Sequence, residues 1–335
     1  MRSIPRLIIA LMLTWLLGGA LANAATPERN VGFEILNMPN GAGPPIEVGV
    51  WYPTDVPAAP RPLGGWRQTV ALAAPIAPGL HPLVVMSHGN GGWFAGHYDT
   101  ALALAHAGFV AAALTHPGDN YQDQSHATDM PARPRALRQL IDYMLGEWPR
   151  RAGIDPSRVG AFGFSSGGFT TLVSIGGVPD FSVFPAHCQV HPANFDCALV
   201  RKAGLPGNIG ALWPPSVWTH DTRIKAAVVA APALGFTFVP DGLKGVTVPV
   251  QLWRDEEDHV LPHPDYAEAA RGALPTPPEY HVVANADHYD FLAPCDPGMA
   301  ARYPEICASR PGFDRAAFHA DFDKAVVAFF VKTLG

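Results

Sequence analysis

The chain has 335 residues, 48% of them hydrophobic, and a formal net charge of −6 at pH 7. Its 33 glycines and 35 prolines indicate many loops, but the hydrophobic fraction is that of a globular protein and excludes a disordered chain. The acidic balance, without any clustered basic stretch, argues against a nucleic-acid partner.

The first 24 residues predict a signal peptide. Arg2 and Arg6 precede an apolar run over 7–21, and Ala22-Asn23-Ala24 has the small-residue pattern of a cleavage site. The apolar run is short for a membrane span, so we expect no stable membrane anchor after cleavage; a retained anchor is the alternative. The sequence thus predicts a periplasmic or secreted protein whose mature chain forms a single domain over residues 25–335.

Apolar runs and turn signals predict a leading hairpin, followed by alternating strands and helices. The hairpin covers 31–36 and 46–52, and residues 53–82, rich in proline and alanine, predict a surface connection. Further strands are expected at 83–87, 109–114, 224–231, 248–253 and 280–284, with one more before Gly163, and helices at 99–107, 135–145, 264–274 and 318–330. This alternation predicts an α/β fold with a mostly parallel central sheet flanked by helices.

The pattern Gly163-x-Ser165-x-Gly167 lies between an apolar strand and a helix. At such a turn the serine hydroxyl projects from the sheet, and the glycines let the strand and the helix approach closely. The same pattern also occurs by chance in glycine-rich turns, so its meaning depends on the residues that follow. We predict Ser165 as a nucleophile.

An acid and then a histidine follow the serine along the chain in sheets that carry this motif. Asp258 follows the strand at 248–253, and His288 follows the strand at 280–284. Both therefore lie at carboxyl ends of strands, where open α/β sheets bind their ligands. We predict Asp258 as the acid and His288 as the base of a Ser/Asp/His triad.

Two alternatives stay open around the acid. Asp255 begins the same acidic run, 255–258, and could replace Asp258 as the triad acid. His259 and His263 are rivals of His288, but they follow the acid too closely to belong to a separate strand end.

An acyl-transfer site also needs N–H donors for the oxyanion of its tetrahedral intermediate. One donor is expected on the residue after the nucleophile, Ser166, and another in the loop at 87–92. The backbone N–H of Asn90 is our candidate for the second donor. An ordinary glycine turn is the alternative.

Residues 178–222 are too many for a simple connection. We interpret them as a small cap over the nucleophile, with Trp213 and Trp218 among the aromatic residues that form apolar walls for an acyl or aryl group. Trp93 and Phe94, beside the predicted oxyanion loop, are expected to join this substrate-binding wall. The alternative is a surface loop whose aromatic residues only fill the core.

Four cysteines in an exported chain favour disulfides. Three pairings are possible, and we prefer the sequence-local one, Cys188–Cys197 with Cys295–Cys307, because each bridge then closes its own loop. Free buried thiols are the alternative.

His187 and His191 suggest a metal site, because their spacing suits one face of a helix. Pro185 and Pro192 argue against a helix there, and a bridged Cys188 could not serve as a ligand. We therefore expect no metal.

Taken together, these segments resemble the α/β-hydrolase superfamily, and within it the bacterial predicted dienelactone hydrolase group, which is related to platelet-activating-factor acetylhydrolases and to cutinase-like polyesterases. The resemblance covers nearly the whole mature chain and depends on Val48–Thr54, Ser87–Asn90, Gly163–Gly168, Val250–Arg254 with Asp258, and His288–Cys295. It implies a serine carboxylic ester hydrolase without a metal or organic cofactor. Two positions depart from the group: Ser165 replaces the cysteine of true dienelactone hydrolases, and Asp287 stands where glycine usually precedes the base.

We therefore predict an exported serine hydrolase that acts on a small-molecule or polymeric ester. A serine peptidase or an acyltransferase with the same triad is the alternative, and a non-catalytic binding protein is a remote one. No heptad repeat or interface stripe indicates an oligomer.

Overall fold

The computed structural model describes residues 29–205 and 209–335, and the predicted signal peptide lies outside the described residues. Within these two ranges, no helix is both long and apolar enough to cross a membrane.

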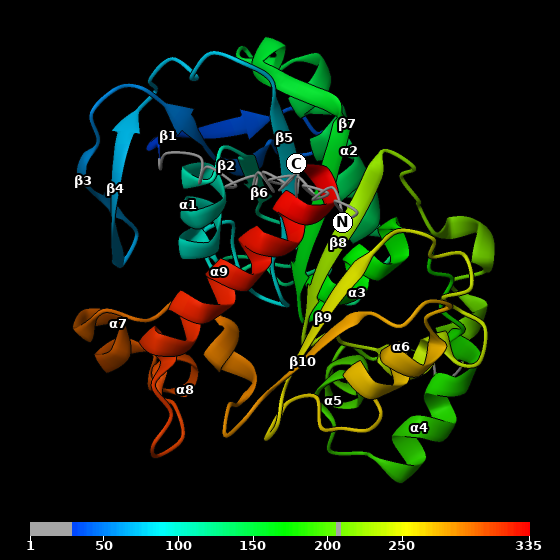
Figure 1. The fold of residues 1–335 in the computed structure, drawn as a ribbon. Coiled ribbons are helices and arrows are strands. Elements are labelled where there is room, and N and C mark those ends of the chain that lie inside the picture. The colour runs from blue at the N-terminus through cyan, green and yellow to red at the C-terminus, as the bar shows by residue number, and fades with distance from the viewer. Residues whose placement is uncertain (1–28, 206–208) are drawn as a thin grey trace, which may run out of the picture.

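The described residues form one ten-stranded sheet (Figure 1). Its strands follow the order β10-β9-β8-β7-β5-β6-β2-β1-β4-β3. The six strands from β5 to β10 run parallel, whereas β2 lies antiparallel to both β1 and β6. The predicted mostly parallel sheet is therefore confirmed. The strands are β1 Asn30–Met38, β2 Ile46–Thr54, β3 Ala59–Leu63, β4 Trp66–Leu72, β5 His81–Ser87, β6 Val110–Leu114, β7 Ile154–Phe164, β8 Ile224–Ala230, β9 Val250–Asp255 and β10 Glu279–Val283.

Helices cover both faces of this sheet (Figure 1). Side chains of α1 (Tyr98–His106) and α9 (Arg315–Leu334) share one hydrophobic core, and those of α2 (Ala132–Gly146) and α3 (Ser166–Ser174) share another. Strand β7 supplies both cores, because Ala161 faces one of them and Phe162 the other. Alternate residues of a strand point to opposite faces, so a central strand covered on both sides is apolar throughout.

The remaining helices are short. The α-helices are α4 Phe184–Val190, α5 Phe195–Lys202, α6 Ala267–Ala273, α7 Pro297–Arg302 and α8 Pro304–Cys307. Single 3₁₀ turns occupy Arg151–Gly153, Phe181–Val183, Ile209–Ala211, Pro215–Val217, Gly235–Phe238 and His288–Phe291.

The structure differs from the sequence prediction over residues 53–82. Strands β3 and β4 form an antiparallel hairpin there, and β4 extends the sheet beside β1. Trp66 and Val70 are buried along β4. Pro60 and Pro62 are compatible with a strand because β3 lies at the edge of the sheet, where a missing N–H costs no ladder hydrogen bond. The predicted surface connection is wrong for this reason.

The segment predicted as a cap contains α4 and α5, packed beside α6 (Figure 1). The expectation that prolines exclude a helix around His187 is wrong. Pro185 lies in the first turn of α4, where its backbone nitrogen needs no partner, and Pro192 follows the end of the helix. Both predicted disulfides, Cys188–Cys197 and Cys295–Cys307, are present, and no described cysteine is free.

The last helix should contribute strongly to stability through Phe330, which is fully buried. A Cβ on Gly160 of β7 would lie 2.6 Å from the Phe330 ring, so the ring packs directly on the strand backbone. We expect Phe330→Ala to lower the free energy of unfolding by about 3–5 kcal/mol in urea titrations. The control is Val331→Ala, whose side chain is 49% exposed and which should change that free energy by less than about 0.5 kcal/mol. Equal effects of the two substitutions would contradict this packing.

Candidate active site

The predicted nucleophile lies on the sharp turn between β7 and α3. Ser165 has φ 55° and ψ −119°, a backbone conformation that a non-glycine residue adopts only under tertiary constraint. The flanking glycines explain that constraint. A Cβ on Gly163 would lie 2.0 Å from the main-chain oxygen of Gly167, and a Cβ on Gly167 would lie 1.9 Å from the main-chain oxygen of Ser87. Only glycine fits at either position.

Three predicted residues from separate strand ends meet at this turn. Nε2 of His288 lies 3.1 Å from Oγ of Ser165, and Nδ1 of His288 lies 2.8 Å from Oδ2 of Asp258. With its Nδ1–H donated to Asp258, the neutral imidazole can accept the Ser165 hydroxyl proton at Nε2. The structure thus brings Ser165, His288 and Asp258 into one hydrogen-bonded chain.

The two carboxyl groups at the end of β9 differ in charge. Burial alone would raise the pKa of Asp258, but His288 and the N–H of Leu261 lower it to about 2. Asp255, in contrast, is buried, and burial together with the neighbouring Asp258 carboxylate raises its pKa well above the ordinary value. Neither Asp255 oxygen has a hydrogen-bond partner among the described residues. Asp258 is therefore the carboxyl group whose charged form is stabilised beside His288, whereas the environment of Asp255 favours its protonated form.

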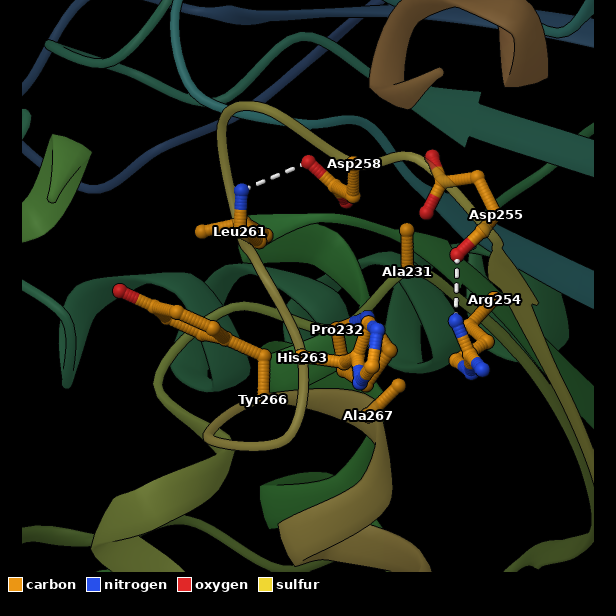
Figure 2. Close-up of a pocket in the computed structure, with 9 residues that line it drawn as sticks. All are labelled: Ala231, Pro232, Arg254, Asp255, Asp258, Leu261, His263, Tyr266 and Ala267. Carbon is orange, nitrogen blue, oxygen red and sulfur yellow. Dashed lines mark hydrogen bonds between the residues drawn. The ribbon is translucent and has the colours of Figure 1, made fainter. Parts of the chain in front are cut away.

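Figure 2 shows how this acid loop is held. Oδ1 of Asp258 accepts the N–H of Leu261 at 2.6 Å, while Nη1 of Arg254 donates to the main-chain oxygen of Asp255 at 3.0 Å. A small cavity lies behind the two carboxyl groups, lined also by His263 and Tyr266. Metal-ligating atoms of Asp255, Asp258 and His288 lie within 4.8 Å of one another. Asp258 and His288 already hydrogen-bond to each other, so their closeness does not by itself indicate a metal site.

The loop that carries His288 is fixed by a buried ion pair. Oδ1 of Asp290 lies 2.9 Å from Nη2 of Arg315, and both side chains are almost fully buried. The second oxygen of Asp290 accepts the N–H of Asp287 at 2.8 Å, and Asp287 in turn accepts the N–H of His288 at 2.8 Å. Residues 287–290 thus form a capped turn that orients the predicted base.

The rival histidines lie elsewhere. Nδ1 of His259 donates to the Asp287 carboxylate at 2.6 Å, and the backbone N–H of His259 donates to the same oxygen. His263 faces the cavity behind the acid. Asp287, where the related group usually has glycine, therefore serves as an acceptor for His259 and for the turn of His288.

The predicted oxyanion loop passes directly beside the nucleophile. A Cβ on Gly89 would lie 3.2 Å from Cβ of Ser165, so a larger residue would require its neighbours to shift by a few tenths of an ångström. The Asp119 carboxylate holds this loop by accepting the side-chain amide of Asn90 at 2.8 Å and the backbone N–H of Gly91 at 2.9 Å. The loop of Asn90 therefore lies close to Ser165 through Gly89, and Ser166 follows Ser165 directly at the start of α3.

A buried arginine of α2 stabilises the loop that carries Asn90, through Asp119 and His88. Arg133 of α2 pairs with Asp119 and donates to the main-chain oxygen of His88, and its Nε donates to Oγ1 of Thr170 at 3.1 Å. Burial and the Arg133 charge lower the pKa of His88 well below its ordinary value, so this imidazole is neutral. Its Nε2 accepts the N–H of His116 at 2.9 Å.

Sequence analysis missed Asp119, Arg133 and His116. Asp119 and His116 follow the strand β6 and could have been found as polar residues at another carboxyl end. Arg133 gives no such signal, because it lies in a helix and its partners are distant along the chain.

The four aromatic residues predicted for the substrate wall divide into two pairs. Phe94 and Trp218 are buried, Phe94 against Gly49 and Trp218 against Phe181. They offer almost no surface to a substrate. The prediction that they line the substrate site is therefore wrong, and both are core residues. Trp93 and Trp213 are partly exposed. Only these two remain candidates for contact with a substrate.

No protein-family model matches the chain, and no curated protein matches it in sequence. In structure, 863 chains of known structure match it. One is a ferulic acid esterase from Streptomyces cinnamoneus, which is 20% identical, with a TM-score of 0.60 over 94% of this chain and 92% of that chain. The chain therefore has the α/β-hydrolase fold, and the predicted fold class is confirmed.

Removal of one partner from the buried pair of Arg133 and Asp119 should be costly for stability. Arg133→Met leaves the Asp119 carboxylate buried without its cation, so we expect the free energy of unfolding to fall by about 3–5 kcal/mol. Arg135→Met in the same helix is the control, because the Arg135 guanidinium is about half exposed and lies 3.7 Å from Asp129. Urea titrations that give both variants the same stability would contradict this assignment.

The raised pKa of Asp255 predicts a pH-dependent gain on substitution. The unfolded chain ionises this residue near pH 4, whereas the folded chain holds the proton to a higher pH, so the contribution of Asp255 to stability falls as the pH rises above about 4. Asp255→Asn removes this penalty. Its gain in the free energy of unfolding over wild type, measured by urea titration, should therefore increase from pH 4 toward pH 7.5, by about 1.4 kcal/mol per pH unit at most. The exposed Asp321→Asn is the control, and a gain that does not vary with pH would refute a raised pKa of Asp255.

Proposed function

We propose that the protein is an exported serine hydrolase that cleaves carboxylic esters through an acyl-enzyme intermediate. The observation that carries this proposal is the hydrogen-bonded chain from Asp258 through His288 to Ser165, with distances of 2.8 and 3.1 Å. Serine is a weak nucleophile at its free pKa and needs an adjacent base that a third group orients. The shared fold of an enzyme named as an esterase adds support.

In the first half-reaction, Oγ of Ser165 attacks the ester carbonyl carbon while its proton passes to Nε2 of His288. Asp258 keeps the imidazole in the required tautomer and stabilises the imidazolium. The tetrahedral intermediate then loses the alcohol oxygen, which takes the proton from Nε2. The acyl group remains bonded to Ser165.

The second half-reaction releases the acid. A water molecule gives a proton to His288 Nε2 and attacks the acyl carbon. When the bond to Oγ of Ser165 breaks, that oxygen recovers the proton and the carboxylic acid leaves. Both steps pass through an oxyanion, so both need the same donors.

The backbone N–H groups of Asn90 and Ser166 are the proposed donors. Ser166 is the first residue of α3, so its N–H has no carbonyl partner within the helix and can point to a ligand. The role of Asn90 is supported by the contacts of its loop with Asp119, which fix the loop whose Gly89 lies beside Ser165. One such donor typically contributes about 3–4 kcal/mol to transition-state stabilisation.

The proposed substrate is a small-molecule or polymeric ester with an apolar or aromatic acyl group. Trp93 stacks on Trp66 at the oxyanion side, and Trp213 packs on Phe181 in the cap. Partly exposed aromatic rings favour apolar groups over charged ones. The resemblance to the predicted dienelactone hydrolase group, with its relatives among lipid and polyester hydrolases, points to the same class.

Export is proposed from two features. The first 24 residues have the pattern of a signal peptide, and the disulfides Cys188–Cys197 and Cys295–Cys307 belong to proteins of oxidising compartments.

Labelling and turnover together test this function. An organophosphonate probe should add to Ser165 with one label per chain, and Ser165→Ala should not be labelled. The kcat of this variant on p-nitrophenyl esters should be about 10⁴–10⁶-fold lower than that of wild type. A panel of acetate, octanoate, hydroxycinnamate and polyester-oligomer substrates gives the acyl preference, and matched amides separate an esterase from a peptidase.

The control for this test is Ser174→Ala in the same helix, whose hydroxyl donates only to the main-chain oxygen of Thr170. It should keep both label and turnover. Full ester turnover by Ser165→Ala, or an unlabelled wild-type protein, would refute the proposal.

A further inference from the structure

Two histidines of the cap lie one helical turn apart. The backbone N–H of His191 donates to the main-chain oxygen of His187 at 2.9 Å, which continues the hydrogen bonding of α4 by one residue. Their ring centroids are 5.0 Å apart. This spacing on one helical face is a common way to present two imidazoles to a metal ion.

A carboxylate from a distant part of the chain completes the group. Asp265, just before α6, places Oδ2 at 3.4 Å from Nε2 of His191. Donor atoms of His187, His191 and Asp265 all lie within 4.8 Å of one another. In a tetrahedral zinc site with bonds of about 2.0–2.1 Å, neighbouring donors are about 3.3 Å apart, so modest side-chain rotations suffice.

A second carboxylate beside His187 has an oxygen without a partner. Oδ1 of Asp196 accepts the N–H of Cys197 and the hydroxyl of Tyr266, at 2.9 and 3.0 Å. Its Oδ2 is buried and has no hydrogen-bond partner among the described residues. Asp196 as a whole is only 7% exposed, so bulk water does not reach this oxygen freely. A carboxylate oxygen of Asp196 lies within 4.8 Å of a ring nitrogen of His187. A buried oxygen without a partner requires an explanation, and a bound ion is one that the neighbouring His187 would suit.

The ring of His187 is held in position, because it stacks on Phe236 with centroids 3.7 Å apart. Partial burial lowers its pKa, and the Asp265 carboxylate acts in the opposite direction. A neutral imidazole is the form that binds transition metals, because the proton of a cation would occupy the ligand position.

We propose that His187, His191 and Asp265 form a binding site for one divalent transition-metal ion of the zinc type, with the Asp196 carboxylate beside His187 at its buried side. Imidazole and carboxylate donors suit Zn²⁺, Co²⁺ and Ni²⁺ rather than Mg²⁺ or Ca²⁺. The ion links α4 of the cap to the loop that follows the acid of the proposed triad. It takes no part in ester cleavage and holds the cap against the rest of the chain.

The direct test is calorimetric titration of ZnCl₂ into tag-free protein, with disulfides intact, after removal of metals by a chelator. We expect one Zn²⁺ per chain at pH 7.5 and a higher Tm with zinc than with chelator. Co²⁺ in place of Zn²⁺ should give the visible absorption bands of a tetrahedral site. His187→Gln and His191→Gln should each weaken zinc binding by about ten-fold or more, because each removes a ligand.

Two controls distinguish binding at these residues from nonspecific zinc binding at surface histidines. His126→Gln, at an exposed histidine outside the cap, should bind zinc as wild type does. Lowering the pH from 7.5 to 5.5 should weaken binding, because an imidazole must lose its proton before it can bind the ion.

The alternative is an ion pair between His191 and Asp265 alone. In that case zinc neither binds stoichiometrically nor changes the Tm, and His191→Gln lowers the Tm equally with and without zinc. Either result overturns the proposal, as does zinc binding that both histidine variants retain. Because the readouts are binding and Tm, their failure leaves the proposed esterase function untouched.

Discussion

The absence of space for a side chain at two glycines is the constraint on which the site depends. Backbone atoms of β5, β7 and α3 meet around Gly163 and Gly167, where a Cβ would lie 2.0 Å or less from a carbonyl oxygen. This contact fixes the strand, the helix and the loop after Ser87 relative to one another without any side chain. It also sustains the positive φ of Ser165, a strain of about 1–3 kcal/mol in isolation.

Buried ion pairs extend this rigid centre to the loops on either side. Arg133 with Asp119 holds the loop before the nucleophile, and Arg315 with Asp290 holds the turn of His288. Such pairs add little net stability, since desolvation offsets their attraction, but removal of one partner is costly. Their effect is therefore to make one arrangement of each loop far more favourable than others. A catalytic site needs such fixed loops, because a shift of about 1 Å in a reacting group can lower the rate strongly.

The sequence predicts much of this site because parallel strands place their carboxyl ends at one edge of a sheet. Ser165, Asp258 and His288 each follow a strand, so their meeting needed only the α/β pattern. The choice between Asp258 and Asp255 required the structure. Both lie at the end of the same strand, and only the direction of each side chain decides which one contacts His288. The role of Arg133 could not be predicted from the sequence, because its partners lie in other elements. The edge strand β3 and the helix α4 were missed because proline disfavours strand and helix interiors but not their edges and first turns.

The pairing of Asp290 with Arg315 joins the turn of His288 to α9. Asp290 lies in the turn of His288, whereas Arg315 is the first residue of α9, the last helix of the chain. The orientation of His288 therefore depends on how the start of α9 packs. A substitution that displaces the first turn of this helix would also displace the turn that carries the imidazole. The stability of α9 and the geometry of the proposed triad are thus linked through one ion pair.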